Sequence, residues 1–150
     1  MKTVAFDDHD RVILGELLRN GRASYTHLGE LTGLSPHAVA PRVRRLVDAG
    51  VITRFTAVLD HRAVGRGLEA LIDIRLLSTA NPDEFEAAVA KLPAAVELSF
   101  LTGRFDYILR TACRDADDLD HTVRALRRAG AAVTETRMMM RTSVFLQPVR

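Results

Sequence analysis

Three arginines within four positions, Arg42, Arg44 and Arg45, could bind nucleic acid. A guanidinium is always charged, contacts phosphate oxygens and recognises guanine through two parallel hydrogen bonds. Apolar residues of the same segment recur at helical spacing, and turning them inward leaves a basic outer face. An ordinary solvated helix face is the alternative, since the helix dipole also favours basic residues near the C-terminal end. The outward residues would be His37, Ala38, Pro41, Arg44 and Arg45, with Arg42 at the flank.

A second group of residues, FLTGRFDY from Phe100 to Tyr107, could bind a small charged molecule. Its glycine-centred turn between two strand-like runs would expose backbone N–H groups that can bind a carboxylate. Asp106 could bind an ammonium group, so that the hairpin would hold both charged ends of an amino acid. From these residues alone, a plain hairpin turn with a surface acid is the simpler interpretation.

Metal and cofactor chemistry is not expected. The five histidines include no pair at i, i+3 or i, i+4, and the single cysteine excludes a disulfide framework within the chain and a Cys-rich zinc site. The acids between Asp115 and Asp120 lack the glycine and glutamate of a calcium loop and fit the start of a helix better. No phosphate-binding loop, dinucleotide fingerprint or nucleophile elbow is present. We therefore expect a protein without cofactor or metal that is not an enzyme.

The composition indicates a globular protein that can bury a core. Hydrophobic residues make up 47% and charged residues 27% of the 150-residue chain. No apolar run approaches about 18 residues, so we expect no transmembrane helix. The first ten residues turn acidic where a signal peptide would be apolar, so we expect a cytoplasmic protein. The net charge of +2 is too small to indicate a partner, and a nucleic-acid argument depends on where the bases cluster.

The first fifty residues predict three short helices with a tight glycine-containing turn between the second and the third, which indicates a helix-turn-helix. A capping residue precedes each helix, and glycine follows it. The expected caps are Asp7 or Asp8, Ser24, and Ser35 with Pro36 at the first helical position; the expected ends are Asn20-Gly21, Gly33-Leu34 and Gly50. The residues expected inside are Ile13, Leu14, Leu17, Leu18, Leu28, Leu31, Val39, Val43, Leu46 and Val47.

Pro41 conflicts with this pattern, because it lies about five residues inside the third helix. Proline there removes a backbone hydrogen bond and costs about 3 kcal/mol. Either the helix kinks at this position, or its first turn is looser than the Ser35-Pro36 pair implies.

The chain changes character after residue 50. Residues 51–59 (VITRFTAVL) are rich in β-formers and could make a strand or a wing, and residues 61–67 (HRAVGRG) are typical of a linker. We therefore expect a helix-turn-helix domain over 1–52, a strand and linker over 53–67, and a second domain over 68–150.

The second domain predicts the order β-α-β-β-α-β. Its first strand alternates apolar and polar residues, its helices show apolar residues at helical spacing, and the two middle strands flank Thr102-Gly103-Arg104. This is the order of the ferredoxin-like split βαβ unit, so the whole chain is predicted to be α+β. Met139 is expected to point away from Met138 and Met140 in the last strand. The expected elements are 68–76, a helix from Asn81-Pro82 to Pro93, 96–101, 105–113, 115–129 and 133–146.

Together these residues resemble the Lrp/AsnC, or feast/famine, family of bacterial and archaeal transcription regulators, over nearly the whole chain. Many regulators share the helix-turn-helix, whereas its combination with a glycine–x–x–Asp–Tyr hairpin in 150 residues is much more specific. The resembling residues are Phe6-Asp7, Asp10, Ile13-Leu14, Leu17, Gly21-Arg22, Leu28, Leu34-Ser35, Val39, Arg42-Val43, Arg45-Leu46 and Gly50-Val51-Ile52, followed by Thr102-Gly103, Phe105-Asp106-Tyr107 and Thr136-Arg137.

The resemblance implies a plain or winged helix-turn-helix joined to a ferredoxin-like effector and oligomerisation domain. Such proteins dimerise through the sheet and hairpin, often build tetramers or octamers, and bind small effectors, commonly amino acids, between subunits. Double-stranded DNA, a small effector and further copies of the chain are thus the expected partners. The residues expected at DNA are Ser24, Tyr25, Thr26, Ser35, Pro36, His37, Arg42, Arg44 and Arg45. The residues expected at the effector are Phe100, Leu101, Thr102, Gly103, Arg104, Asp106, Tyr107, Met139 and Met140.

Two positions depart from the family pattern. The residue after the hairpin glycine is frequently acidic in the family, and this chain has Arg104. We expect this arginine to favour an effector with an extra negative charge, to change the orientation of the effector, or to abolish the response. Pro41 in the third helix is the other departure.

Two alternative functions follow from the same scaffold. One is an enzyme that resembles siroheme decarboxylases, which would hold a carboxylated tetrapyrrole with histidine and arginine. The intact basic third helix and the scattered histidines argue against it. The other is an architectural DNA-binding protein that responds to no ligand.

Overall fold

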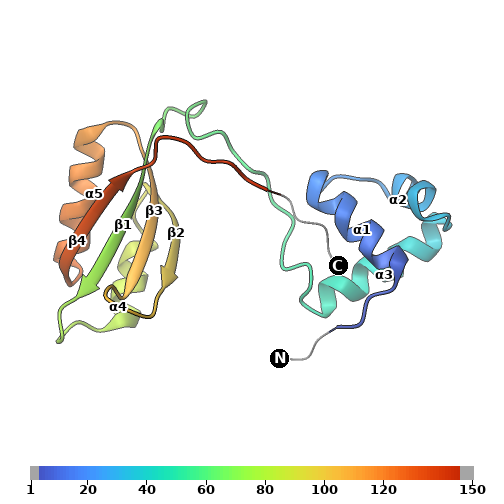
Figure 1. The fold of residues 1–150 in the computed structure, drawn as a ribbon, viewed down its shortest axis with the longest axis horizontal. Helices are drawn as coiled ribbons and strands as arrows, with labels where there is room; N and C mark the ends of the chain where they lie inside the picture. The colour runs from blue at the N-terminus through green and yellow to red at the C-terminus, as the bar shows by residue number, and fades with distance from the viewer. Residues whose placement is uncertain (1–3, 146–150) are drawn as a thin grey trace. The chain divides into compact units, whose positions relative to one another are not determined.

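The computed structural model describes residues 4–145, within which the chain forms five helices and four strands (Figure 1). Contacts divide the chain into two units, and the unit changes after Val58 and after Thr142. The first unit contains α1 (Asp8–Arg19), α2 (Tyr25–Thr32) and α3 (Pro36–Asp48). The second contains β1 (Leu68–Leu76), α4 (Pro82–Val89), β2 (Ala95–Phe100), β3 (Tyr107–Cys113), α5 (Ala116–Arg128) and β4 (Ala131–Met138).

The predicted helix caps of the first unit are confirmed. Asp7 caps α1 in a reciprocal capping box with Asp10, and the hydroxyls of Ser24 and Ser35 cap α2 and α3. Gly33 ends α2 with a φ of 71°, in the left-handed region where glycine has no side-chain clash. These local interactions determine where the three helices begin and where α2 ends.

The core of the first unit is narrower than the apolar pattern predicted. Leu18, Leu31 and Val47 were expected inside, but they are 47%, 47% and 42% exposed. Each lies at the edge of its apolar stripe, and three helices of 8 to 13 residues bury only the middle of such a stripe. The buried residues are Ile13, Leu14, Leu28, Val39, Val43 and Leu46, with Leu17 partly buried beside them.

Pro41 does not interrupt α3, which runs continuously from Pro36 to Asp48. The first turn is regular, since the Ser35 hydroxyl accepts from the Ala38 N–H at 3.2 Å and the Ser35 carbonyl from the Val39 N–H at 3.1 Å. The looser first turn is therefore not what the structure shows. The proline ring lies on the exposed side of the helix.

The strand or wing expected over residues 51–59 is not formed. Val51 and Ile52 instead close the end of α3, because both N–H groups donate to the Leu46 carbonyl at 2.9 and 3.1 Å. Residues 53–59 have no backbone hydrogen bond to any residue between 4 and 145. β-forming residues make a strand only where a partner strand is present, and here none is alongside them.

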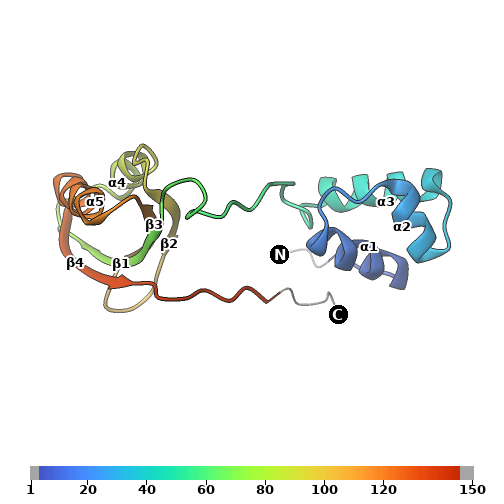
Figure 2. The same cartoon turned by 90° about the horizontal axis from the view of Figure 1, so that it is seen from above.

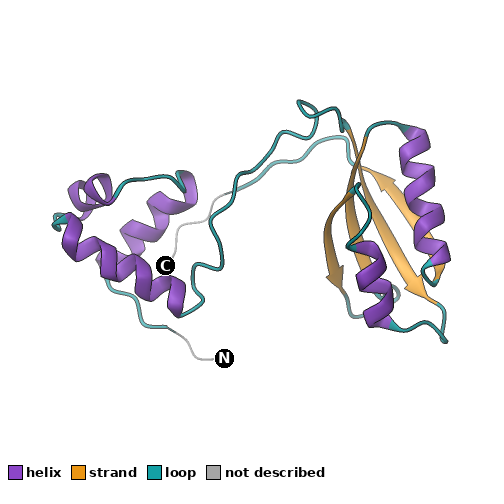
Figure 3. Cartoon of the chain, turned by 180° about the vertical axis from the view of Figure 1, so that it is seen from behind, coloured by secondary structure: helices purple, strands orange, loops and turns teal. Residues whose placement is uncertain are grey.

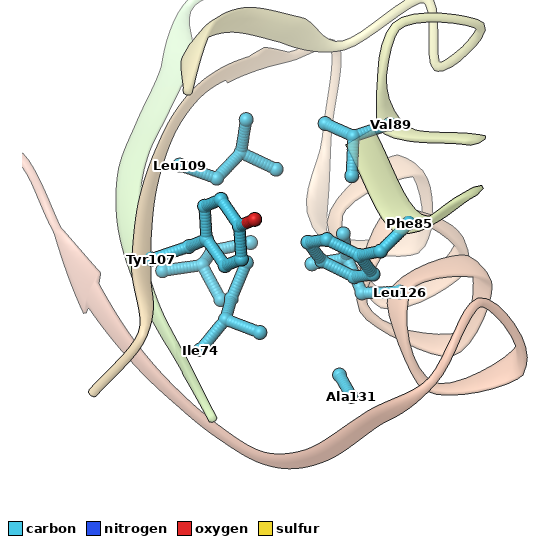
Figure 4. Close-up of a cluster of buried hydrophobic side chains, with 8 residues drawn as sticks. Ile74, Phe85, Val89, Tyr107, Leu109, Leu126 and Ala131 are labelled. Carbon is cyan, nitrogen blue, oxygen red and sulfur yellow. The ribbon is translucent and has the colours of Figure 1, made fainter. Parts of the chain in front are cut away.

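The second unit is a four-stranded antiparallel sheet of order β2-β3-β1-β4, with α4 and α5 on one face (Figures 2 and 3). This confirms the predicted β-α-β-β-α-β order and the α+β class. In β1, the alternation predicted one buried face, and Ala70, Ile72 and Ile74 are buried. Asp73 on the opposite face is also buried, and it pairs with Arg137 at 2.6 Å. The core residues between sheet and helices are Ile72, Ile74, Phe85, Val89, Tyr107, Leu109, Leu126 and Ala131 (Figure 4).

The last strand is shorter than predicted. It was expected from Val133 to Leu146, but β4 ends at Met138, opposite Ala70. Its antiparallel partner β1 begins at Leu68, two residues before Ala70, so little of β1 is left to pair with. The last contact is the Met139 N–H, which donates to the Glu69 carbonyl at 2.9 Å. Met139 and Met140 therefore follow the strand rather than lie in it. Leu146 is outside the described residues.

Candidate nucleic-acid interface and effector site

A close approach of backbone joins α2 to the turn before α3. The Leu34 N–H donates to the Gly29 carbonyl at 3.0 Å, and a Cβ on Gly29 would lie 2.5 Å from the Leu34 carbonyl oxygen. Only glycine fits at this point, because the obstacle is backbone rather than a movable side chain. The contact holds α2, the turn and α3 in the arrangement of a helix-turn-helix.

The residues expected at DNA form three sets in this unit. One lies at the start of α2, one at the start of α3, and the third consists of the arginines of α3. Ser24, Tyr25 and Thr26 are exposed at the start of α2, and Ser35, Pro36 and His37 at the start of α3. The oxygens of Ser24 and Ser35 already accept from the N–H groups of His27 and Ala38, at 3.1 and 3.2 Å. Each hydroxyl can still donate its proton to a phosphate or a base.

Two of the three arginines of α3 are held by carboxylates of α1, an arrangement that we call the acid clasp (Asp7, Asp10, Arg42 and Arg45). Arg42 Nη1 donates to Asp7 Oδ2 at 2.6 Å and to Asp10 Oδ1 at 3.0 Å, and Arg45 Nη2 donates to Asp10 Oδ2. Asp10 is buried, with 1% of its side chain exposed. The sequence interpretation missed these pairs, because the partners lie 32 to 35 residues apart and only the capping box was a local pattern.

The clasp shifts the pKa values of Asp7 and Arg42. The Asp10 backbone N–H and the Arg42 guanidinium lower the pKa of Asp7 to about 2. Hydrogen bonds to Asp7 and then Asp10 raise the pKa of Arg42. Both effects favour the ion pairs of the clasp.

Arg44 has different surroundings from its two neighbours. Its side chain is exposed on the outer face of α3, and no carboxylate of residues 4–145 lies within 4.0 Å of its guanidinium. It is therefore the arginine of α3 whose charge is available to a partner without exchange of an ion pair.

The hairpin between β2 and β3 presents a cationic tip. The Leu101 N–H donates to the Asp106 carbonyl at 2.8 Å, and Gly103 has a φ of 119°. The Arg104 guanidinium lies 5.1 Å from the centre of the Phe105 ring. Thr102, Gly103 and Arg104 are exposed, so the tip is accessible in the single chain.

Asp106 has a structural partner that the sequence interpretation did not predict. Its Oδ2 accepts from the Leu76 N–H at 2.7 Å, and its own N–H donates to the Ile74 carbonyl at 2.9 Å. The residue thereby fastens the hairpin to the end of β1. One of the two carboxylate oxygens expected at an ammonium is already occupied by this backbone hydrogen bond.

Tyr107 lies in the core rather than at the hairpin tip. Its ring packs against Phe85 at a centroid distance of 5.3 Å (Figure 4). It also packs against Phe100 at 5.2 Å, and its hydroxyl donates to Glu86 Oε1 at 2.8 Å. Burial, and secondarily the Glu86 carboxylate, raises the pKa of Tyr107 to about 12. A hollow of about 510 Å³ beside α4 and β2 includes Phe100 and Tyr107 in its lining but none of residues 101–106.

Met139 and Met140 are not beside the hairpin within one chain. They line a separate hollow of about 430 Å³ with Arg62 and Glu69. Met139 bonds to Glu69, whereas Asp106 bonds to Ile74, five residues further along β1. At about 3.4 Å per residue, the two groups lie at points on β1 roughly 17 Å apart. The structure brings together Phe100 to Tyr107, and leaves the two methionines at the other end of the sheet.

Neither a cluster of metal ligands nor a membrane-spanning helix is found in the described part of the chain. Within residues 4–145, no three His, Cys, Asp or Glu side chains gather in a way that could hold a metal ion. In the same range, no helix is both long and apolar enough to cross a membrane.

Comparison with known proteins gives matches to both units. The AsnC-type helix-turn-helix domain matches residues 6–47, and the Lrp/AsnC ligand binding domain matches residues 69–148. The uncharacterised HTH-type transcriptional regulator PF0054 of Pyrococcus furiosus is 36% identical over 129 residues, which cover 83% of this chain and 81% of that protein. The leucine-responsive regulatory protein of Salmonella typhimurium is 41% identical over 112 residues, covering 73% and 68%. The structure of transcriptional regulator NMB0573 from Neisseria meningitidis with L-methionine has a TM-score of 0.88 at 28% identity, with 97% of both chains covered.

The fold and these matches define a transcriptional regulator with a DNA-binding helix-turn-helix and a ligand-binding domain. The chain belongs to the Lrp/AsnC family.

Proposed function

We propose that the protein is a sequence-specific DNA-binding regulator in which α3 enters the major groove. The observation that carries this proposal is the exposed outer face of α3 after a close-packed α2 and turn, with Arg44 unpaired among residues 4–145. In a helix-turn-helix, residues near the N-terminus of the second helix contact base edges, and flanking groups contact phosphates. Ser35, His37 and Arg44 fit these positions. Ser24 to Thr26 lie at the start of α2, the first helix of the helix-turn-helix, and would contact the DNA backbone.

A dimer would place two α3 helices about one helical turn, 34–36 Å, apart on an approximately palindromic site. Phosphate contacts would dominate the affinity and make it sensitive to salt. We propose that the protein acts in the cytoplasm, where such DNA is found, and that neither domain has a catalytic role, since its relatives are named as regulators.

Replacement of Arg44 by Ala tests this use of α3. The affinity for duplex DNA, measured by gel shift or fluorescence anisotropy, should fall about fivefold or more, since one guanidinium contact contributes about 1–3 kcal/mol. Arg124→Ala is the matched control, because it removes an exposed arginine of α5 in the other unit. Equal affinities of the two variants would contradict the proposal. Arg44 is a better target than Arg45, whose removal would also deprive the buried Asp10 of a partner.

We infer that a small effector, in the first place an amino acid, acts on the second unit. The support is the Lrp/AsnC ligand binding domain and the similarity to a regulator whose structure contains L-methionine. The hairpin tip with its N–H groups and Arg104 would hold the carboxylate of the effector. Because Met139 and Met140 lie at the far end of β1, a site that contains them and the hairpin needs two chains.

Titration calorimetry with each of the twenty amino acids tests the effector proposal. Arg104 should favour an effector with a second negative charge, since its guanidinium adds to the positive potential of the tip. Arg104→Asp should then weaken acidic amino acids selectively. Binding that is the same for acidic and neutral amino acids, and unchanged in the variant, would contradict this role of Arg104.

We propose that the effector acts by changing the assembly of dimers into tetramers or octamers, as a shift between existing populations. Light scattering after size-exclusion chromatography would show a change of mass with the effector. A mass that stays constant while DNA affinity changes would contradict this mechanism.

A further inference from the structure

The acid clasp divides the three arginines of α3 into two that are neutralised and one that is not. We propose that Asp10 is a positioning residue for DNA recognition, which withholds Arg42 and Arg45 from phosphate contacts and leaves Arg44 as the principal cationic contact of α3. The inference rests on the proposed DNA binding and adds to it a residue of α1 that would not touch DNA.

The geometry of the clasp supports this role. The buried carboxylate of Asp10 accepts from both Arg42 and Arg45, and Asp7 adds a second acceptor for Arg42 Nη1 at 2.6 Å. Arg42 is 28% exposed, and its guanidinium forms ion pairs with both carboxylates. Two carboxylates face two guanidiniums, and the cluster as a whole is neutral at pH 7.

Burial makes these pairs costly to exchange. Asp10 is 1% exposed, so the departure of both arginines to phosphates would leave a buried carboxylate with the Asp7 backbone N–H in place of two cations. Arg45 is half exposed and uses only Nη2 toward Asp10, so its other N–H groups can contact a base edge while its charge stays paired with Asp10. Arg45 is thus held in one orientation rather than excluded from the interface.

The clasp should affect specificity more than affinity for one chosen site. Non-specific affinity arises almost entirely from phosphate neutralisation, and each neutralised phosphate contributes about 0.9 to the dependence of log K on log salt. A neutral cluster contributes little to that term, whereas base contacts by oriented side chains are kept. Asp10 would therefore raise the ratio of specific to non-specific binding.

The test is the salt dependence of binding to a random-sequence duplex, which needs no known operator. Asp10→Asn should release Arg45 and leave Arg42 with Asp7 alone, and it should steepen the slope of log K against log salt by about 1 or more for each α3 engaged. The full-length Asp8→Asn variant is the matched control, because it removes the same charge from α1 at a residue whose exposed pair is with Arg11. Its slope should stay close to that of the unaltered protein.

A second variant keeps the test decisive if Asp10→Asn does not fold, as judged by circular dichroism. Asp7→Asn retains a good helix cap and removes one acceptor of Arg42 from a half-exposed position. Its slope of log K against log salt should be steeper than that of Asp8→Asn. Equal slopes for the folded clasp variants and Asp8→Asn would overturn the inference and leave the proposed function standing. If the unaltered protein binds no duplex of a random pool even at low salt, the proposed function itself is overturned, and the inference with it.

Discussion

The three arginines of α3 show how much a side chain's surroundings decide its role. In the sequence they form one basic run, and the prediction treated all three as DNA contacts. In the fold Arg42 and Arg45 lie against carboxylates of α1, and Arg44 lies on the exposed face. Spacing within a helix gives the face of each residue but not the partner that a distant segment brings to it.

Asp7 should make the stability of the first unit depend on acid pH. Its pKa is about 2 in the folded chain, against an ordinary value of 3.8, so the ionised carboxylate favours folding. This stabilisation is present above about pH 4 and is lost as the pH falls toward 2. In thermal unfolding between pH 5 and 2, Asp7→Asn should lose less stability with falling pH than the unaltered protein does.

Asp118 also has a lowered pKa, through the Arg114 N–H and guanidinium, so the unaltered protein will lose stability in acid for two reasons. The comparison with Asp7→Asn isolates the first of them. Identical pH dependences in the two proteins would contradict the lowered pKa of Asp7.

Tyr107 should be sensitive to the loss of a single oxygen. Tyr107→Phe removes the hydrogen bond to Glu86 but keeps the ring packing, so it should cost about 1 kcal/mol in urea unfolding. Because the folded pKa is raised to about 12 from 10.0, the contribution is present below pH 10 and is lost as the pH rises to 12. Ultraviolet titration of the variant should lack the tyrosine step near pH 12. A persistent step would show that Tyr107 is not the residue responsible.

At the scale of elements, the local interactions were predictable. Ser24, Ser35 and Asn81 were expected to start helices, and each caps one in the fold, because a cap is decided by a side chain and the next three backbone N–H groups. The order of strands and helices along the second unit followed from the alternation and the turn residues. The interactions among distant segments were not predictable in this way.

Three wrong predictions arose because they depend on interactions between distant segments. Leu31 has the spacing of a buried residue, but no third layer covers its side of α2. Residues 53–59 have β propensity without a partner strand, and β4 ends at Met138 because β1 offers no further pairing. Of the candidate site, Phe100 to Tyr107 form the predicted hairpin, and its binding of an effector stays a prediction. The sequence interpretation missed the hydrogen bond of Asp106 to Leu76 and the acid clasp.

Gly29 should be essential to the helix-turn-helix. Gly29→Ala would place a Cβ 2.5 Å from the Leu34 carbonyl oxygen, and we expect a loss of about 1–3 kcal/mol together with weaker DNA binding. Gly15→Ala in α1 is the matched control, since nothing lies within 4 Å of its added Cβ. The control should be up to about 1 kcal/mol more stable than the unaltered protein, measured by thermal unfolding. Equal stabilities would contradict the close approach.

At the scale of the whole molecule, the separation of Met139 and Met140 from the hairpin is the main structural constraint on the proposed effector site. One chain cannot bring these groups together across roughly 17 Å of β1. The family likeness implies sites between subunits, and this geometry agrees with that implication.

A site shared between chains can be tested by complementation. Arg104→Asp and Met140→Asp should each strongly weaken the binding of an acidic amino acid, because each damages one half of the proposed site. Mixed dimers of the two variants should recover binding at about half of the sites or fewer, since the intact halves meet only in some interfaces. Calorimetry of the mixture measures the recovery. Variants that fail to complement, or of which one still binds fully, would contradict a shared site.

Selection of bound DNA from a random pool, with and without a mixture of amino acids, tests the central claim most directly. The unaltered protein should enrich an approximate palindrome with half-sites about one helical turn apart, and amino acids should change its recovery or spacing. Arg44→Ala, verified to be folded, should lose that enrichment. A pool without any enriched sequence, or the same sequence recovered by the variant, would contradict sequence-specific recognition by α3.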